Sequence, residues 1–230
     1  MVLVWSFYAV NQCVDLETKT GSLESLLRST VAIDNKMVKS LDDSAHIQYL
    51  KKHIKIESEE ASSKIILLEA EGLEISTLLS FAGDSTVQEL VLEWLKSEFG
   101  AIVFPIQLDQ KVLVQLVDSI LHTNKMKNAE FYRIKFLFGV ETNQGSLKRI
   151  EMELDKGTMK TFSENSEKHV LENVIIPYIY QETGMQIPKL NLNMISMIGF
   201  AKFARDNITT VSNNVEDEVL LMLLKSAQLG

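Results

Sequence analysis

The stretch LVLEWLKSEFGAIVFPIQL, residues 90–108, decides how this chain is interpreted. A tryptophan, two phenylalanines and a proline in so short a segment could line an active site or pack the interior of a protein that binds other proteins. The apolar residues of its first half follow helical spacing and form one stripe: Val87, Leu90, Val91, Trp94 and Leu95. Charged residues fall on the opposite side, so we predict an amphipathic helix whose aromatic side chains pack a core.

Signals at both ends of this helix support the prediction. Ser85 and Gln88 fit a capping box, and Gly100 is suited to a left-handed C-terminal cap. Residues 101–106 then predict a short strand that Pro105 confines to a sheet edge or a strand end. Asp109 is placed to cap a second helix, whose buried face would be Val112, Leu113, Leu116, Val117, Ile120 and Leu121.

The residues that precede this stretch indicate strands. The segments rich in apolar and β-branched residues, paired around turns, predict an antiparallel meander with one short helix at 22–28. The predicted strands are 2–10, 46–56, 64–70 and 73–83.

The second half of the chain begins with the clearest hairpin, residues 131–154, in which alternate apolar residues line one face on both sides of a turn. Residues 166–183 predict a helix that Pro177 either kinks or divides into two pieces. Residues 190–205 fit a strand or a helix equally well, and residues 216–228 predict a final helix.

The final helix is unusual because six consecutive apolar residues, Val219 to Leu224, surround its whole circumference. A helix that is apolar all round is buried on several sides. Either it threads the core of its own chain, or one side meets another chain, and the sequence leaves both alternatives open.

Length and composition favour one domain of mixed class. The chain has 230 residues, 46% of them apolar, and three prolines with no flexible linker between segments. We therefore predict a single α+β domain over residues 1–230. The sequence has a net charge of −8, one cysteine, no signal-peptide pattern and no apolar run long enough for a membrane span. These features predict a soluble, intracellular protein that is neither membrane-bound nor a general DNA-coating protein.

Charge is distributed unevenly along the chain. Residues 125–160 carry eight basic and five acidic groups, a net charge of +3. This segment is either a solvated hairpin of mixed charge or a mildly basic face near DNA. The candidate DNA-facing residues are Lys125, Lys127, Arg133, Lys135, Lys148, Arg149, Lys156 and Lys160.

Motifs for catalysis or cofactor binding are absent from the sequence. It contains no nucleophile elbow, no dinucleotide-binding glycine pattern and no phosphate-binding loop. The histidines 46, 53, 122 and 169 do not have the spacing of a local zinc site, and Cys13 has no nearby base. Tyr178 and Tyr180 suit packing or a protein interface better than chemistry. We predict no catalytic residues, no metal and no cofactor.

Two motifs nevertheless resemble a known family. LVLEWLKSEFGAIVFPIQLDQK and VIIPYIYQETGMQIPKLNL are similar to segments of the centromere protein L (CENP-L) family in its fungal form. Phe99 stands where that family has tyrosine, and Phe104 where a second tryptophan often occurs. The resemblance is strongest over residues 87–120 and 174–192, looser along the rest of the chain, and absent from the loops around 34–64 and 139–169.

The resemblance implies a curved, mostly antiparallel sheet with helices packed on one face. It further implies a non-enzymatic subunit of the inner kinetochore, located in the nucleus at centromeres. Such a subunit pairs with the C-terminal region of a CENP-N-type partner, contacts other inner-kinetochore subunits and supports chromosome segregation. Its contact with DNA would be indirect or weak.

Two routes of association are consistent with these features. A partner could add a strand to a sheet edge, where backbone hydrogen bonds give affinity. The final helix could also form a partner interface or a homodimer, with the residues Val215, Val219, Leu220, Met222, Leu223 and Leu224. An unrecognised enzyme is a third interpretation, and it would require titratable groups that converge in a pocket.

Overall fold

Helix α2, Ser85–Phe99, forms where the opening stretch predicts it, but its cap differs from the prediction. The N-cap is Asp84, whose carboxylate accepts hydrogen bonds from the N–H groups of Thr86 and Val87, so Ser85 is already helical. The Gln88 amide, expected to complete a capping box, donates instead to the hydroxyl of Tyr8 at 2.5 Å. Gly100, with φ of 63°, ends the helix in the predicted left-handed conformation.

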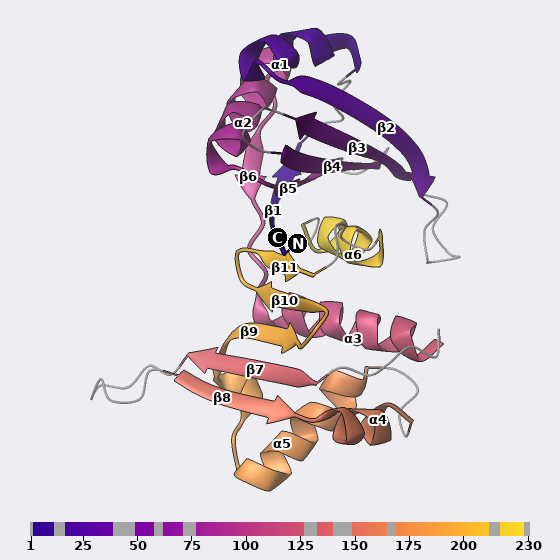
Figure 1. The fold of residues 1–230 in the computed structure, drawn as a ribbon. Coiled ribbons are helices and arrows are strands. Elements are labelled where there is room, and N and C mark those ends of the chain that lie inside the picture. The colour runs from indigo at the N-terminus through magenta and orange to yellow at the C-terminus, as the bar shows by residue number, and fades with distance from the viewer. Residues whose placement is uncertain are drawn as a thin grey trace, which may run out of the picture. The chain divides into compact units, whose positions relative to one another are not determined.

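The computed structural model describes nine segments of the chain (Figure 1): residues 2–11, 17–38, 49–57, 62–70, 77–126, 133–139, 149–164, 169–211 and 217–227. Contacts within the chain group into two compact units. Unit 1 consists mainly of residues 107–213, and unit 2 of residues 3–106 together with 214–230. The predicted single domain over residues 1–230 stays a prediction.

Unit 2 contains an antiparallel sheet in the order β2-β3-β4-β5-β1, with the short β6 also paired to β1. Its strands are β1 Leu3–Val10, β2 Thr30–Val38, β3 Tyr49–Glu57, β4 Ser62–Ala70, β5 Thr77–Ala82 and β6 Val103–Pro105. The predicted strand meander and the edge position of Pro105 are confirmed. Strand β2 is an addition, since no element was predicted for its residues.

Two layers cover the sheet of unit 2. The short 3-10 helix η1, Glu17–Lys19, leads into α1, Thr20–Leu27, which packs on α2. Alternate residues of the strands, such as Ile54 and Leu79, form a core with Leu23 of α1 and Trp94 of α2. The remaining strand residues point to the second face, and the final helix α6, Asp217–Ala227, packs against β4 and β5.

Unit 1 contains a second antiparallel array in the order β11-β10-β9-β7-β8. Its strands are β7 Ile134–Gly139, β8 Arg149–Leu154, β9 Asn191–Met197, β10 Ala201–Ala204 and β11 Ile208–Thr210. The predicted hairpin is confirmed in its register, because Ile134, Phe136 and Phe138 lie opposite Leu154, Met152 and Ile150. Residues 190–205, undecided between helix and strand, form β9 and β10.

Helices cover the apolar face of this array. They are α3 Gln110–Met126, α4 Lys156–Glu164, the π-helix η2 Leu171–Ile175, α5 Ile176–Thr183 and the 3-10 helix η3 Ile187–Lys189. Pro177 lies in the first turn of α5, which continues η2 directly because Ile175 and Ile176 both keep a right-handed helical backbone. The predicted helix therefore changes from π-helical to α-helical next to Pro177 and is not divided into two pieces. The opposite face of β7 and β8 carries charged side chains. Unit 1 is therefore a one-sided sheet with helices on one face, within a mixed α+β chain.

Helix α4 and strand β11 were not predicted from the sequence. Lys156 and Lys160 consequently lie on a helix and not in the charged hairpin. In the described part of the chain, no helix is both long enough and apolar enough to cross a membrane.

Candidate interaction surfaces

Trp94 packs a core, as the amphipathic pattern predicts. Its side chain is buried, and its ring meets Phe99 edge-to-face with centroids 5.2 Å apart. The indole N–H donates to the Ser22 hydroxyl at 2.9 Å, which satisfies the polar end of the ring. Trp94 and Phe99 therefore hold α2 against α1 and the sheet. Phe104 of β6, the third aromatic residue of the stretch, is 40% exposed.

The two tyrosines of α5 have different environments. Tyr178 packs its ring against Phe162 of α4, with centroids 4.9 Å apart. Tyr180 is 51% exposed. Packing therefore accounts for Tyr178. Tyr180 is exposed, and a role for it in partner binding stays a prediction.

Helix α6 is buried within its own chain. Leu220, Leu223 and Leu224 have no exposed surface, and Val219 is 4% exposed. Met222 is half-buried, and Val215 lies outside the described residues. Of the two alternatives for this helix, packing inside its own chain accounts for the leucines. A partner interface or homodimer contact at α6 stays a prediction, with Met222 as the described residue whose surface is partly open to it.

The basic residues of the hairpin are paired with carboxylates. Arg133 contacts Glu153 at 3.2 Å, while Lys135 and Arg149 both contact Glu151, at 2.5 and 3.5 Å. The hydrogen bond from Lys135 is the main cause that lowers the pKa of Glu151, and the charges of Lys135 and Arg149 act in the same direction. The exposed face of β7 and β8 thus carries three cations and two carboxylates.

Two of the other candidate DNA-facing residues, Lys156 and Lys160, lie on α4. Lys160 lies within 3.8 Å of Glu164 one turn later on α4, and Lys156 is exposed at the start of that helix. Lys125 belongs to α3, although its side chain is not described, and Lys127 and Lys148 lie outside the described residues. Of the five candidates whose side chains are described, the structure brings together three, Arg133, Lys135 and Arg149, and carboxylates neutralise much of their charge.

Each sheet ends on a strand that could accept a partner strand. Among the described strands, β2 pairs with β3 alone and β8 with β7 alone. The edge strand β8 carries charged side chains at alternate positions, Arg149, Glu151 and Glu153, a pattern that discourages edge-to-edge pairing. The edge strand β2 is longer, with nine residues, all in register with β3.

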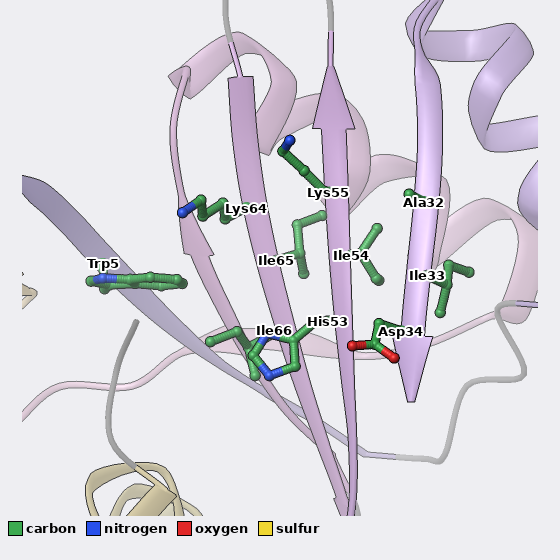
Figure 2. Close-up of a pocket in the computed structure, with 10 residues that line it drawn as sticks. All are labelled: Trp5, Ala32, Ile33, Asp34, His53, Ile54, Lys55, Lys64, Ile65 and Ile66. Atoms are coloured by element: carbon green, nitrogen blue, oxygen red, sulfur yellow. The ribbon is translucent and has the colours of Figure 1, made fainter. Parts of the chain in front are cut away.

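The second face of unit 2 contains an open hollow over β2, β3 and β4, with a volume of about 470 Å³ (Figure 2). Two rows of residues line it across the strands. The first row places Ala32 opposite Lys55, and Lys55 opposite Lys64. The second row places Asp34 opposite His53, and His53 opposite Ile66. Trp5 of β1 and Ile66 are buried beside these charged groups.

Sequence reasoning did not identify this hollow. The lysines belong to a segment in which only an imperfect alternation was visible, and β2 was not predicted. The pattern KKHIKI places Lys55 on the face opposite to Ile54 and Ile56, but the register with Lys64 becomes known only when both strands are aligned. The register of β3 with β2 and β4 was therefore the information that the sequence did not supply.

A buried ion pair lies on the opposite face of the same sheet. The Lys52 ammonium and the Glu69 carboxylate are 2.8 Å apart, and both residues are buried. Removal of either partner would leave the other charge buried without this ion pair, which destabilises a fold. We therefore regard the pair as structural.

One group of residues in unit 1 could hold a cation. Asp118, His169 and Glu172 offer ligand atoms that lie within 4.8 Å of one another. Asp118 already has a structural role, because its carboxylate accepts hydrogen bonds from the N–H groups of Leu171 at 2.6 Å and Glu172 at 3.3 Å. Burial is the main cause that raises the pKa of Asp118, and these hydrogen bonds oppose it. His169 and Glu172 are exposed. We therefore regard Asp118 first as a cap of the helix that begins near Leu171, and the group only second as a candidate metal site.

Comparison with known proteins relates the chain to a family model and to a curated protein. A family model described as IML3 matches residues 1–225. The chain is also 28% identical over 241 residues to the "Inner kinetochore subunit IML3" of Saccharomyces cerevisiae (strain ATCC 204508 / S288c). That alignment covers 99% of this chain and 98% of the yeast protein.

Proposed function

Because the chain belongs to the IML3 family, we propose that it is a non-enzymatic subunit of the inner kinetochore that supports chromosome segregation at centromeres in the nucleus. Family membership confirms the resemblance to fungal centromere protein L that the motifs at 87–120 and 174–192 indicate. The observation that carries the proposal is the match along nearly the whole of both chains to a protein named as an inner kinetochore subunit.

The described residues support a binding role over a catalytic one. The aromatic residues of the family motifs, such as Trp94 and Tyr178, pack against other rings. The buried carboxylate of Asp118 is engaged by two backbone N–H groups. An enzyme would need convergent titratable groups in a pocket that a substrate can enter. The hollow over β2, β3 and β4 does bring Asp34, His53, Lys55 and Lys64 together, so the proposal of a non-enzymatic role rests on family membership.

We further propose that a CENP-N-type partner adds a strand to the β2 edge. Backbone groups on the outer side of β2 supply the hydrogen bonds, and alternate side chains supply specificity. Strand β2 is favoured over β8 for two reasons: it is longer, and it has two charged residues in nine, whereas β8 has three in six. Charged residues on an edge strand discourage pairing. Other inner-kinetochore subunits would then contact the remaining surface.

Proline substitution tests this edge. Ala32 and Asn35 are three residues apart on β2, so the N–H of one points toward β3 and the N–H of the other points away from it. Of the variants Ala32→Pro and Asn35→Pro, the one that removes the outward-pointing N–H should keep the fold. We expect that folded variant to lose the complex with the C-terminal fragment of the CENP-N-type partner, measured by light scattering. The matched control replaces Glu151 or Met152 of β8 by proline, and its folded variant should retain the complex. Loss of the complex in the β8 control alone would contradict the assignment to β2.

Direct contact with DNA stays a prediction with a weaker electrostatic basis. Arg133, Lys135 and Arg149 each have a carboxylate neighbour that competes with phosphate. Binding by the isolated chain should therefore be weak and should fall as salt rises. Tight binding that is insensitive to salt would contradict this expectation.

A further inference from the structure

Two segments of unit 1 that lie far apart in the sequence bring three side chains with metal-ligating atoms together. Asp118 belongs to α3, His169 directly precedes the helix that contains η2, and Glu172 lies in η2. The ligand atoms of the three side chains lie within 4.8 Å of one another. Two ligands of one zinc ion are separated by at most about 4.2 Å, twice a zinc–ligand distance of about 2.1 Å. Small rotations of the exposed His169 and Glu172 side chains would therefore bring all three groups onto one ion.

The group has an excess of negative charge. It contains two carboxylates and one imidazole, and no lysine or arginine of the described residues acts on the Asp118 carboxylate. Burial is the main cause that raises the pKa of Asp118, and the charge of Glu172 acts in the same direction. Two backbone N–H groups and the charge of His169 oppose these causes without overcoming them. A divalent cation between the two carboxylates would offset their repulsion.

The cap that Asp118 forms is compatible with metal binding. Its Oδ1 accepts a hydrogen bond from the N–H of Leu171 at 2.6 Å, and its Oδ2 accepts one from the N–H of Glu172 at 3.3 Å. Each carboxylate oxygen has two lone pairs, so each N–H leaves one of them available. Carboxylates that ligate metals are themselves hydrogen-bonded, which fixes their orientation. The cap thus holds the buried ligand in place for the two exposed ones.

Unusual features of the backbone and of a neighbouring histidine occur at the same place. His169 has a left-handed backbone, with φ of 54°, and the π-helix η2 that follows is a rare form frequent at functional sites. His122 lies one turn after Asp118 on the same side of α3, and its buried Nδ1 has no hydrogen-bond partner among the described residues. A buried polar atom of this kind requires an explanation, and a water bound to a nearby cation would be a suitable partner.

We propose that Asp118, His169 and Glu172 bind one divalent transition-metal ion, and that Zn²⁺ suits them best. An imidazole nitrogen with two carboxylate oxygens is a donor set that zinc accepts, whereas Mg²⁺ and Ca²⁺ prefer oxygen ligands alone. Water would complete the coordination, and the ion would fasten α3 to the start of η2. All three ligands belong to unit 1, so the site does not depend on the proposed strand addition at β2. The spacing of the histidines along the sequence could not predict it, because the ligands come from separate elements.

Isothermal titration calorimetry with ZnCl₂ tests the proposal on the full chain, freed of metal by a chelator and without a histidine tag. We expect one Zn²⁺ per chain, bound about tenfold or more weakly by His169→Gly and by Glu172→Gln. Glycine suits the positive φ at position 169 and both side chains are exposed, so both variants should fold. Glu182→Gln, at an exposed position of α5, imposes the same change of charge as Glu172→Gln and should bind as the unaltered chain does.

Thermal unfolding supplies a second readout, since an ion that binds only the folded chain raises its melting temperature. Zn²⁺ should raise the melting temperature of the unaltered chain and of Glu182→Gln more than that of either ligand variant. Circular dichroism establishes that each variant is folded, and either ligand variant serves alone if the other unfolds. Three results would overturn the proposal: no saturable binding at one ion per chain, equal binding by the ligand variants and the unaltered chain, or tighter binding of Mg²⁺ or Ca²⁺ than of Zn²⁺.

Discussion

Asp84 shows how one side chain determines where an element begins. The first turn of a helix has N–H groups without intrahelical partners. Thr86 and Val87 donate two of them to the Asp84 carboxylate, at 2.7 and 3.2 Å. These hydrogen bonds hold the pKa of Asp84 below its ordinary value, and the bond from the Thr86 N–H is the largest cause.

Replacement of Asp84 should therefore affect stability in a way that depends on pH. Asp84→Ala should lower the melting temperature at neutral pH, while Asp84→Asn, which keeps an acceptor oxygen, should lower it less. A carboxyl whose pKa is depressed on folding contributes stability above its unfolded pKa, and this stability is lost as pH falls through the folded pKa. The difference between wild type and Asp84→Ala should thus shrink in acid. Thermal unfolding from about pH 7 to about pH 2 measures it, and a difference that is constant with pH would contradict the role of the charge.

Helix α6 shows how an element can be predicted while its environment is not. Its helical form follows from the residues, but an all-round apolar surface fits a core and an interface equally well. The structure places Leu220 and Leu224 inside the chain, with no exposed surface.

Glutamate substitution in α6 distinguishes these environments. If α6 served a partner, Leu220→Glu/Leu224→Glu would dissociate a complex and leave the monomer folded. Since both leucines are buried, we expect loss of cooperative folding, and Leu224→Ala alone should lower the free energy of unfolding by about 2–5 kcal/mol. Met222→Glu, at a half-buried position, is the matched control and should retain the fold. Chemical denaturation measures each variant, and a stable monomeric double mutant would restore the interface interpretation.

Elements were predictable where local pattern and packing agree. The β7–β8 pairing follows from alternation on both sides of a turn, and Pro177, which lacks an N–H, stands next to the change from the π-helix η2 to α5. Helix α4 was missed because Gly157 lies in its first turn. Its signal was Asp155, which accepts hydrogen bonds from the N–H groups of Gly157 and Thr158. The apposition of Lys55 and Lys64 depends on register across strands, which one strand alone does not specify.

At the scale of the whole molecule, the two units differ in how the chain builds them. Unit 1 is formed almost entirely by the continuous segment 107–213. Unit 2 combines residues 3–106 with 214–230, and α6 from that second piece packs on β4 and β5. The stability of unit 2 therefore depends on residues at opposite ends of the sequence.

Deletion of residues 214–230 should affect the units unequally. Unit 2 loses the helix that covers β4 and β5, so amides of β5 such as those of Leu78 and Leu79 should exchange faster with solvent. Amides of β7 in unit 1 should keep their protection. Hydrogen exchange read by mass spectrometry of the full and shortened chains compares them. Equal loss in both strands would mean that the units unfold together.

The split of unit 2 also has a consequence during synthesis. Domains usually fold in the order in which the ribosome releases them, the N-terminal one first. Here the sheet that begins at Leu3 lacks its α6 cover until residues 217–227 have been translated, whereas residues 107–213 emerge earlier as one uninterrupted piece. The unit whose translation begins first is thus completed after the other, and until α6 has emerged the apolar residues of β4 and β5 that it covers stay exposed.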